Sequence, residues 1–301
     1  MGRFPEAKFI AAVTMGAALF SAVYWLFGFL RMGTTGLAAQ AYGRGDINEV
    51  LAVGLRAGAV ALVIGTAIVL LQIPLKWLLF KLFDASAEVA ELARVYYEIR
   101  IYGAPGLLIY LVALGMLFGL QRMRDTLWLS IGFNLSNIIL NALLVLVFNY
   151  GVAGVAMGTV ISEWFAAAAG VGFVYRALRI SGWQGNWPVH IWISDAVRAL
   201  FHIGSNLVVR TFFVQLPFFV GTIMATGLGD VTLAAHGVLM QLFFVMTYGL
   251  DGFAHSAETL AGYAYGGKTP DNLRKTTRFC AFWAVVIAAA TGLMFWIMGE
   301  T

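Results

Sequence analysis

The chain has 301 residues, of which 61% are hydrophobic and 11% are charged, and its formal net charge is +4. Soluble domains carry about 25% charged residues, so this composition excludes a water-soluble globular protein and predicts an all-α polytopic membrane protein. The basic residues form small clusters between apolar segments, without the continuous stripe that is typical of nucleic-acid binding.

Eight stretches are apolar over a length that can cross a bilayer, for which a helix needs about 20 residues. In chain order they cover residues 9–33, 50–79, 95–120, 127–148, 151–175, 199–226, 232–265 and 279–298. Pro105 and Pro217 fall inside two of them, where a membrane helix tolerates proline as a kink. The sequence therefore predicts eight transmembrane helices.

Lysine and arginine are unevenly distributed over the connections between these stretches. They follow the first, third, fifth and seventh stretches, whereas the connections after the fourth and sixth contain neither residue. The connection after the second, with Lys76 and Lys81, is the exception. The positive-inside rule places the basic connections in the cytoplasm. We assign Arg31 and Arg56 to helix ends beside the first of them. The longest polar segment, 176–198, is predicted to be a cytoplasmic linker whose tryptophans suit a membrane interface.

One short motif occurs twice. Residues 37–43 read LAAQAYG and residues 260–266 read LAGYAYG, so five of seven positions agree. Six predicted helices separate the copies, which places both copies at the same membrane face. This pattern predicts two parallel six-helix repeats related by an axis along the membrane normal, an arrangement known among transporters.

The repeat also predicts the domain organisation. Residues 1–180 are expected to form an N-terminal lobe that lacks its first helix, and residues 181–198 the linker between lobes. Residues 199–301 are expected to form three helices of a C-terminal lobe. By this reasoning the chain holds about eight helices of an intended twelve.

Polar residues inside membrane helices are costly, so each is a candidate for function. The seventh stretch carries the densest set, with Asp251, His255 and Glu258 on one helical face and Tyr248 nearby. These side chains are expected to line a cavity or to pair with a group such as Arg210 in the preceding helix. Two interpretations remain open: an ion-pair network that locks helices together, and a site that responds to protons or cations.

A second polar set lies in the fourth and fifth stretches. Asn134, Asn137 and Asn141 share a helical face, and Thr159 and Glu163 lie one turn apart. Asparagines often bond neighbouring membrane helices to each other, so a structural role and a cavity-lining role both remain open. We expect Glu163 to be an isolated buried carboxyl group, which can gain and lose a proton as its surroundings open and close.

The sequence contains no complete enzymatic or metal-binding motif. His255-x-x-Glu258 has a spacing found in metal sites, but HExxH, GxSxG, Walker A and paired-cysteine motifs are absent. The single cysteine excludes an internal disulfide. We therefore expect neither an enzyme nor a bound metal or cofactor.

Several segments resemble the multidrug and toxin extrusion (MATE) family of transporters. They are FLRMGTTGLAAQAYGRGD at 29–46, GLQRMRD at 119–125, SNIILNALLV at 136–145, GVAGVAMGTVISEW at 151–164 and LDGFAHSAETLAGYAYGG at 250–267. Within the family they are similar to the branch of DNA-damage-inducible protein F (DinF). The likeness covers nearly the whole chain.

The resemblance implies twelve helices in two six-helix lobes that rock between outward-open and inward-open forms. It also implies export of small amphipathic, often cationic compounds against an inward flow of H⁺, with Na⁺ as the alternative coupling ion.

The resemblance extends to individual residues. Relatives use a first-helix acid, an Asn-x-x-x-Asp pair and a threonine; here Asn137 and Thr159 match, Asn141 replaces the aspartate, and the first-helix acid has no counterpart. Three acids of this sequence match acids of the DinF-like branch: Glu163, Asp251 and Glu258. They are the titratable candidates, and His255 is a supporting candidate.

The preferred hypothesis is a monomeric, multi-pass antiporter of the bacterial inner membrane, with amphipathic compounds and the lipid bilayer as its partners and no nucleic acid. Two alternatives remain. One is a non-functional fragment of such a transporter, and the other is a flippase for lipid-linked precursors with a related two-lobe architecture.

Overall fold

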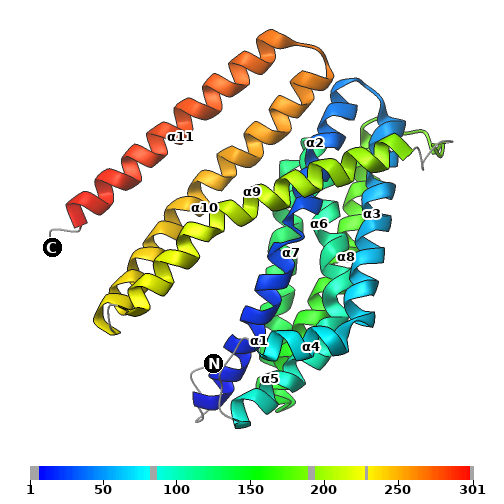
Figure 1. Cartoon of the computed structure of the whole chain (residues 1–301). Coiled ribbons are helices and arrows are strands. Elements are labelled where there is room, and N and C mark those ends of the chain that lie inside the picture. The colour runs from blue at the N-terminus through cyan, green and yellow to red at the C-terminus, as the bar shows by residue number, and fades with distance from the viewer. Residues whose placement is uncertain (1–6, 82–86, 189–193, 228–229, 299–301) are drawn as a thin grey trace.

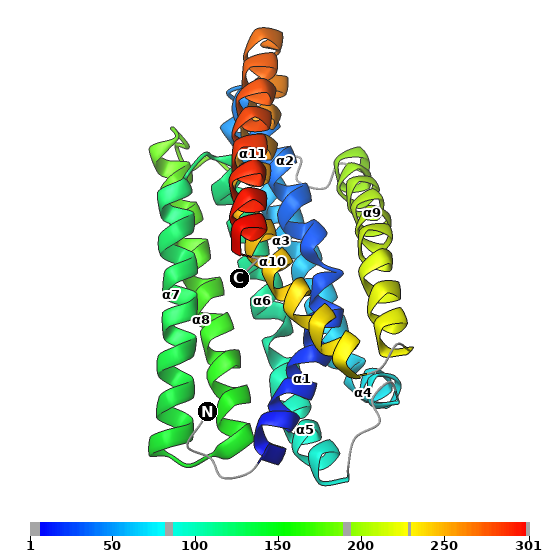
Figure 2. The same cartoon turned by 90° about the vertical axis from the view of Figure 1, so that its left-hand side faces the viewer.

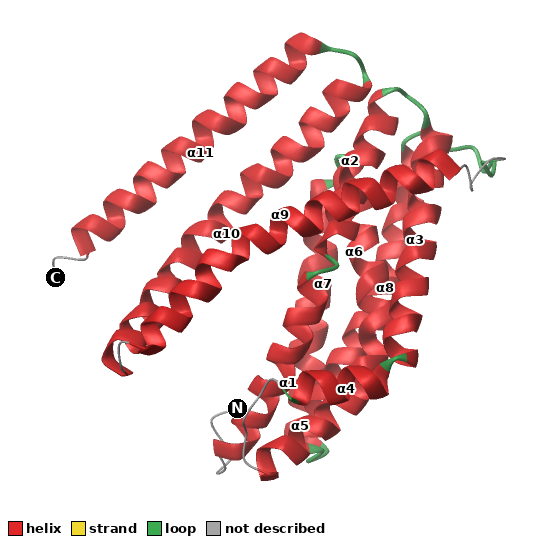
Figure 3. Ribbon diagram, in the orientation of Figure 1, coloured by secondary structure: helices red, strands yellow, loops and turns green. Residues whose placement is uncertain are grey.

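The computed structural model describes residues 7–81, 87–188, 194–227 and 230–298, and within these ranges it contains helices and no strand (Figures 1 and 3). The all-α class predicted from the composition is confirmed. Part of the predicted linker, residues 189–193, lies outside the described residues.

Residues 7–188 form a helical bundle, which we call the body. Its helices are α1 (Ala7–Trp25), α2 (Gly28–Gly43), α3 (Ile47–Leu70), α4 (Gln72–Phe80), α5 (Ala87–Arg100), α6 (Ala104–Gly119), α7 (Met123–Ala142) and α8 (Gly151–Ile180). A 3-10 turn, Ile101–Gly103, joins α5 to α6, and a π-helical turn, Leu143–Val147, extends α7. The long helices run along the bundle, whereas the short α4 lies across its lower end in Figure 1.

The rest of the described chain forms three long helices, which we call the arm: α9 (Ser194–Gly227), α10 (Asp230–Gly266) and α11 (Pro270–Met298). Helices α9 and α10 both contact α2 of the body, and α11 packs on α10. In Figure 1 the upper ends of α2 and α10 meet and their lower ends diverge, so that arm and body form a V. Figure 2 shows α7 and α8 on the side of the body away from α9.

The hydrophobic core belongs to the body. Its buried cluster runs from Ala12 to Trp183, whereas the buried apolar side chains described in the arm are those of Ala225, Ala264 and Cys280. The arm instead exposes many large apolar side chains. In a bilayer such surface meets lipid tails or further helices, which are as apolar as the side chains themselves.

Six segments of the described residues are long and apolar enough to span a membrane. They are Lys8–Gly43, Ile47–Leu70, Ala87–Gly119, Met123–Val147, Gly151–Ile180 and Pro270–Ile297, and they coincide with the first five predicted stretches and the eighth. Helices also occupy the sixth and seventh predicted stretches, as α9 and α10, although these two are not among the six.

The first predicted stretch is longer than expected. It continues to Gly43 instead of ending near residue 33, with only a turn at residues 26–27 between α1 and α2. Arg31 lies in the first turn of α2 and thus well inside the apolar segment Lys8–Gly43, and not at the end of a membrane helix as the sequence analysis had assigned it. Arg56 also lies inside its helix, where it is buried and pairs with Glu49 at 2.7 Å.

The second predicted stretch, 50–79, is broken. Helix α3 ends at Leu70, and α4 begins after Leu71. Pro74 explains the break, because it has no N–H to donate to the carbonyl of Leu70 and its ring crowds that carbonyl.

The two copies of the repeated motif contact each other, at the upper ends of α2 and α10. The ring centroids of Tyr42 and Tyr263 are 5.5 Å apart. A Cβ atom at Gly43 would overlap the carbonyl oxygen of Tyr263, and a Cβ atom at Gly266 would overlap that of Gln40. Because 223 residues separate the copies, Gly43 corresponds to Gly266 and Gln40 to Tyr263. The contacts are therefore reciprocal, as in the isologous interface of a symmetric dimer.

At the middle of this contact, two equivalent residues face each other. A Cβ atom built on Gly262 would lie 3.0 Å from the Cβ atom of Ala39. The helices thus approach so closely that their backbones touch, which glycine permits and larger residues prevent. The duplicated motif is the point at which arm and body are joined.

The basic connections lie at this same end of the molecule. The α2–α3, α6–α7 and α10–α11 connections and the start of the α8–α9 segment are all at the top of Figures 1 and 2. Their positions agree with the prediction that they share one membrane face.

Candidate functional site

The polar residues of α10 face α2 of the body. Nη1 of Arg31 lies 3.2 Å from Nδ1 of His255, and the guanidinium of Arg31 also interacts electrostatically with Asp251 and Glu258. Arginine has only donors, so Nδ1 of His255 accepts this hydrogen bond and the imidazole is neutral in this arrangement. All three side chains that were predicted to share a helical face therefore interact with Arg31, His255 through a hydrogen bond and the two acids at longer range.

Sequence reasoning missed Arg31 because it treated the residue as a charge at a helix end. The central guanidinium carbon of Arg31 lies 5.9 Å from the ring centroid of Phe118 in α6, and the ring of His255 lies 5.4 Å from the same centroid. Arg31 thus touches the arm and a second helix of the body. A signal was available, because the small residues after Arg31 continue the helix up to Gly43.

Among the described residues, Asp251 and Glu258 of α10 have no directly bonded partner. Asp251 is exposed and Glu258 is half-buried, and among the described residues neither makes a hydrogen bond or a close ion pair. Glu258 interacts at longer range with Arg31 and with Arg210 of α9. The expected pairing with a group such as Arg210 is thus seen for Glu258 only, and only as this longer-range attraction.

A cavity of about 580 Å³ lies between α9 and the helices α1, α2 and α6. Arg31 and Arg210 line it from opposite sides, together with polar groups such as Ser21, Tyr24 and Thr211. No carboxylate belongs to its lining. Arg31 and Arg210, the two arginines that act on Glu258, therefore lie beside a space that a small molecule can enter.

Tyr248 lies apart from this cluster. Its side chain is exposed and stacks on Phe244, with ring centroids 6.4 Å apart, and it does not line the cavity between α9 and the body.

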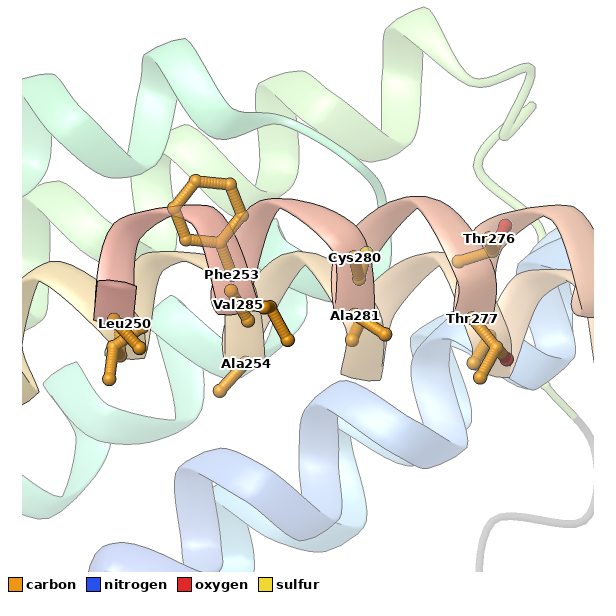
Figure 4. Close-up of a pocket in the computed structure, with 12 residues that line it drawn as sticks. Leu250, Phe253, Ala254, Thr276, Thr277, Cys280, Ala281 and Val285 are labelled. Carbon is orange, nitrogen blue, oxygen red and sulfur yellow. The ribbon is translucent and has the colours of Figure 1, made fainter. Parts of the chain in front are cut away.

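A groove of about 610 Å³ lies between α10 and α11 (Figure 4). Leu250, Phe253, Val285 and several alanines line it, with Cys280 and two threonines as the exceptions. It contains no acid or base that is charged at neutral pH, so it offers packing surface for an apolar group and no charge chemistry.

Glu163 of α8 is buried, as expected, but it is not isolated. Both of its carboxylate oxygens accept hydrogen bonds from Arg100 of α5, each at 2.5 Å. Only 1% of the Glu163 side chain and 9% of the Arg100 side chain are exposed. Two-point arginine–carboxylate pairing of this kind is the strongest form of ion pair, so the prediction of an isolated carboxyl group at Glu163 is wrong.

Aromatic rings enclose this ion pair. The guanidinium carbon of Arg100 lies 5.2 Å from the ring centroid of Phe20 and 5.3 Å from that of Tyr24. Rings above a guanidinium stabilise its charge through their negative faces. The sequence analysis missed Arg100, although an arginine within the predicted stretch 95–120 was a visible signal of a buried partner.

The asparagines of α7 divide into two groups. Asn141 donates to Oδ1 of Asn137 at 3.1 Å, and Asn137 donates to Oγ1 of Thr159 in α8 at 3.2 Å. Asn134 is exposed and donates to the carbonyl of Ser130 in its own helix at 2.8 Å. Asn137, Asn141 and Thr159 therefore form a chain between helices, and Asn134 does not belong to it.

Two chemically different sites result. The Arg100–Glu163 pair is saturated, since each oxygen of the carboxylate already has a partner, whereas the carboxylates of α10 are free to attract a proton or a cation. Among the described residues, no group of three or more His, Cys, Asp and Glu side chains is arranged to hold a metal ion.

Comparison with known proteins agrees with this architecture. The family model described as MatE matches residues 1–143 and 207–301. The chain is 32% identical over 300 residues to DNA damage-inducible protein F of Escherichia coli (strain K12), an alignment that covers 100% of this chain and 65% of that protein. It is 26% identical over 276 residues to the probable multidrug resistance protein NorM of Rhizobium meliloti (strain 1021), covering 85% of this chain and 56% of that one.

A solved structure has the same fold. The crystal structure of MATE in complex with MaD3S superimposes with a TM-score of 0.85 at 18% identity and covers 98% of this chain and 66% of that one. At this identity the similarity concerns the fold alone. The chain spans between 56% and 66% of the length of these three proteins.

Proposed function

The chain belongs to the MatE family of transporters, and from this membership we propose that it is a secondary active exporter of small amphipathic, often cationic compounds. Export is driven by inward movement of H⁺, with Na⁺ as the alternative coupling ion, and needs no cofactor. The protein acts as a monomer in the bacterial inner membrane, a location that its multi-span helices and bacterial relatives support. We orient the protein with its basic connections in the cytoplasm, which makes segment 176–198 cytoplasmic.

The observation that carries the proposal is the V formed by arm and body. Contact between the two motif copies closes one end, and the helices diverge toward the other (Figure 1). In the proposed cycle the lobes rock about a central axis, so that contacts at the closed end separate while the open end closes. Packed interfaces of this kind switch between discrete arrangements and do not deform continuously.

Coupling is assigned to the acids of α10. A deprotonated Asp251 or Glu258 attracts a cationic compound, and protonation cancels that attraction. Each open state hydrates these carboxylates to a different degree, so proton binding biases the conformation. Couplings of about 1–3 kcal/mol are typical between two linked sites and correspond to about 5- to 150-fold in affinity. His255 supports the acids as a neutral neighbour.

The other candidate residues have narrower roles in this proposal. Asn137, Asn141 and Thr159 supply polar groups between α7 and α8 of the body. Glu163 is held by Arg100 in the conformation described, so it can exchange a proton only if that pair opens. Arg210 neutralises part of the charge of Glu258. Tyr248 contributes aromatic surface to the exposed side of α10, and Asn134 contributes polar surface to the exposed side of α7.

The test is transport in proteoliposomes. The purified chain is reconstituted, a pH gradient is imposed, and uptake of a fluorescent lipophilic cation is followed. The double variant Asp251→Asn/Glu258→Gln is expected to lose gradient-driven transport, because neither amide can titrate. The matched control Asp271→Asn removes an acid in the first turn of α11, outside the cluster, and should transport normally. Undiminished transport by the double variant would refute the assignment.

A further inference from the structure

The acids of α10 are balanced by charges on other helices. Among the described residues, the cations that act on Glu258 are Arg31 from α2 and Arg210 from α9. The cation that acts on His255 is Arg31, and the anion that acts on it is Asp251. Charges interact over long distances where little water screens them, so these arginines compensate the acids without touching them.

Arg31 is held in place by neutral groups and not by the acids. Its one hydrogen bond among the described contacts goes to Nδ1 of His255 at 3.2 Å, and its guanidinium lies over the face of Phe118. The carboxylates of Asp251 and Glu258 therefore retain all their acceptor sites. Their positive environment comes from an arginine that is anchored beside them and that also lines the adjoining cavity.

We infer that Arg31 is a specificity-determining residue, which acts as a tethered counter-cation for Asp251 and Glu258 and competes with cationic substrates for their attraction. This inference rests on the proposed function, which supplies the cationic substrate. In the absence of substrate, Arg31 offsets part of the negative charge of Asp251 and Glu258. A lipophilic cation takes over this role when it binds, and the apolar lining of the cavity accommodates its body.

The competition gives a prediction opposite to that of a structural role. Removing the charge of Arg31 increases the attraction of the acids for a mobile cation, whereas loss of a purely structural arginine weakens binding. Arg31→Gln is the suitable variant, because glutamine is neutral and retains N–H donors for a hydrogen bond. Arg31→Lys keeps the charge and should behave like the original protein.

The experiment measures equilibrium binding of tetraphenylphosphonium to the purified 301-residue chain in detergent, without any gradient. Triphenylphosphine oxide, a neutral molecule with similar rings, serves as the matched probe. Arg31→Gln is expected to bind the cation about tenfold more tightly and the neutral probe with unchanged affinity. Thermal unfolding of each variant reports whether the fold is retained.

Two further variants complete the design. Arg31→Gln/Glu258→Gln should lose the gain, because the released carboxylate is then absent. Arg179→Gln removes an arginine in the last turn of α8, where it contacts Tyr175 and Trp183. This variant should leave cation binding unchanged.

Three results would overturn the inference: equal or weaker cation binding by a folded Arg31→Gln, an equal gain for the neutral probe, or a gain that survives in the double variant. Because no gradient is used, these results are independent of transport in proteoliposomes, so failure here leaves the proposed export function standing.

Discussion

The body and the arm each contain a glutamate within a long helix, Glu163 in α8 and Glu258 in α10, and the surroundings of the two differ. Glu163 in the body is 1% exposed and bound at two points by Arg100. Glu258 in the arm is half-buried, with Arg31 and Arg210 acting on it only at longer range. A saturated pair fixes helices to each other, whereas an unsaturated acid can respond to protons and cations. The same pair of residue types thus serves as a lock in one region and as an available charge in the other.

Packing follows the same division. The body buries a continuous apolar cluster between Ala12 and Trp183, and the arm contacts it mainly through α2. A region that moves in the proposed transport cycle can have only few buried contacts with its neighbour. Local stability is low where buried contacts are few. The contact at the duplicated motif is therefore a main attachment of the arm to the body.

The largest effect is expected from breaking the lock in the body. Glu163→Gln leaves Arg100 buried without its counter-charge, and loss of one partner of a buried ion pair costs about 3–5 kcal/mol. Unfolding of the purified chain, followed by circular dichroism in mixed micelles, measures the free energy of unfolding. The double variant Arg100→Met/Glu163→Met should recover most of the loss, because apolar side chains need no partner.

Glu98→Gln is the matched control for this prediction. Glu98 pairs with Lys76 at 2.8 Å on an exposed part of the body, where ion pairs contribute less than about 1 kcal/mol. If Glu163→Gln were no less stable than Glu98→Gln, the buried pair would not be a lock.

A smaller effect is expected at the joint between body and arm. Gly266→Ala places a Cβ atom against the carbonyl of Gln40, and overpacking of this kind costs about 1–3 kcal/mol. The motif copies should separate and the arm should populate other positions. Spin labels at Leu135 in α7 and Leu293 in α11, both exposed, report the distance distribution in a Cys280→Ala background.

Gly252→Ala provides the control, because it makes the same change in the same helix at a position with no atom within 4 Å of the new methyl group. Its distance distribution should match that of the parent protein. A Gly266→Ala variant with that same distribution would show that the close backbone contact does not determine the position of the arm.

The smallest effect concerns the hydrogen bonds between α7 and α8. Asn137→Ala removes the donor to Thr159 and the acceptor for Asn141, and such bonds between membrane helices contribute about 0.6 kcal/mol on average. A small decrease in the free energy of unfolding is expected. Asn134→Ala, in which only a bond within α7 is lost, should show no decrease, and equal effects of the two changes would contradict the assignment.

The fold was predictable from the sequence because composition and apolar length determine membrane helices almost alone. The repeated motif, read only as a sign of symmetry, gave the equivalence of α2 and α10 but not their contact. The break at Leu71 was missed, although Pro74 signals it, because an apolar run continues on both sides of the break.

The candidate site was predictable only in part. The helical face of Asp251, His255 and Glu258 follows from their spacing, since they all lie on α10. Their partner Arg31 could not be found in this way, because the residues that separate Arg31 from His255 say nothing about their distance in space. The same holds for Arg100 and Glu163. Spacing identifies which charges share a helix, and only packing between helices decides which charges are paired.

The centre of the joint holds one of the two positions at which the motif copies differ. Where a two-fold axis passes between two helices, a residue meets its own counterpart, and both must fit into one space. An alanine on each side would bring two methyl groups to 3.0 Å, closer than carbon atoms pack comfortably. The chain carries Ala39 on one side and Gly262 on the other, so only one of the two equivalent positions has a methyl group and the close approach is kept. A single chain can make this compromise, whereas two identical subunits cannot.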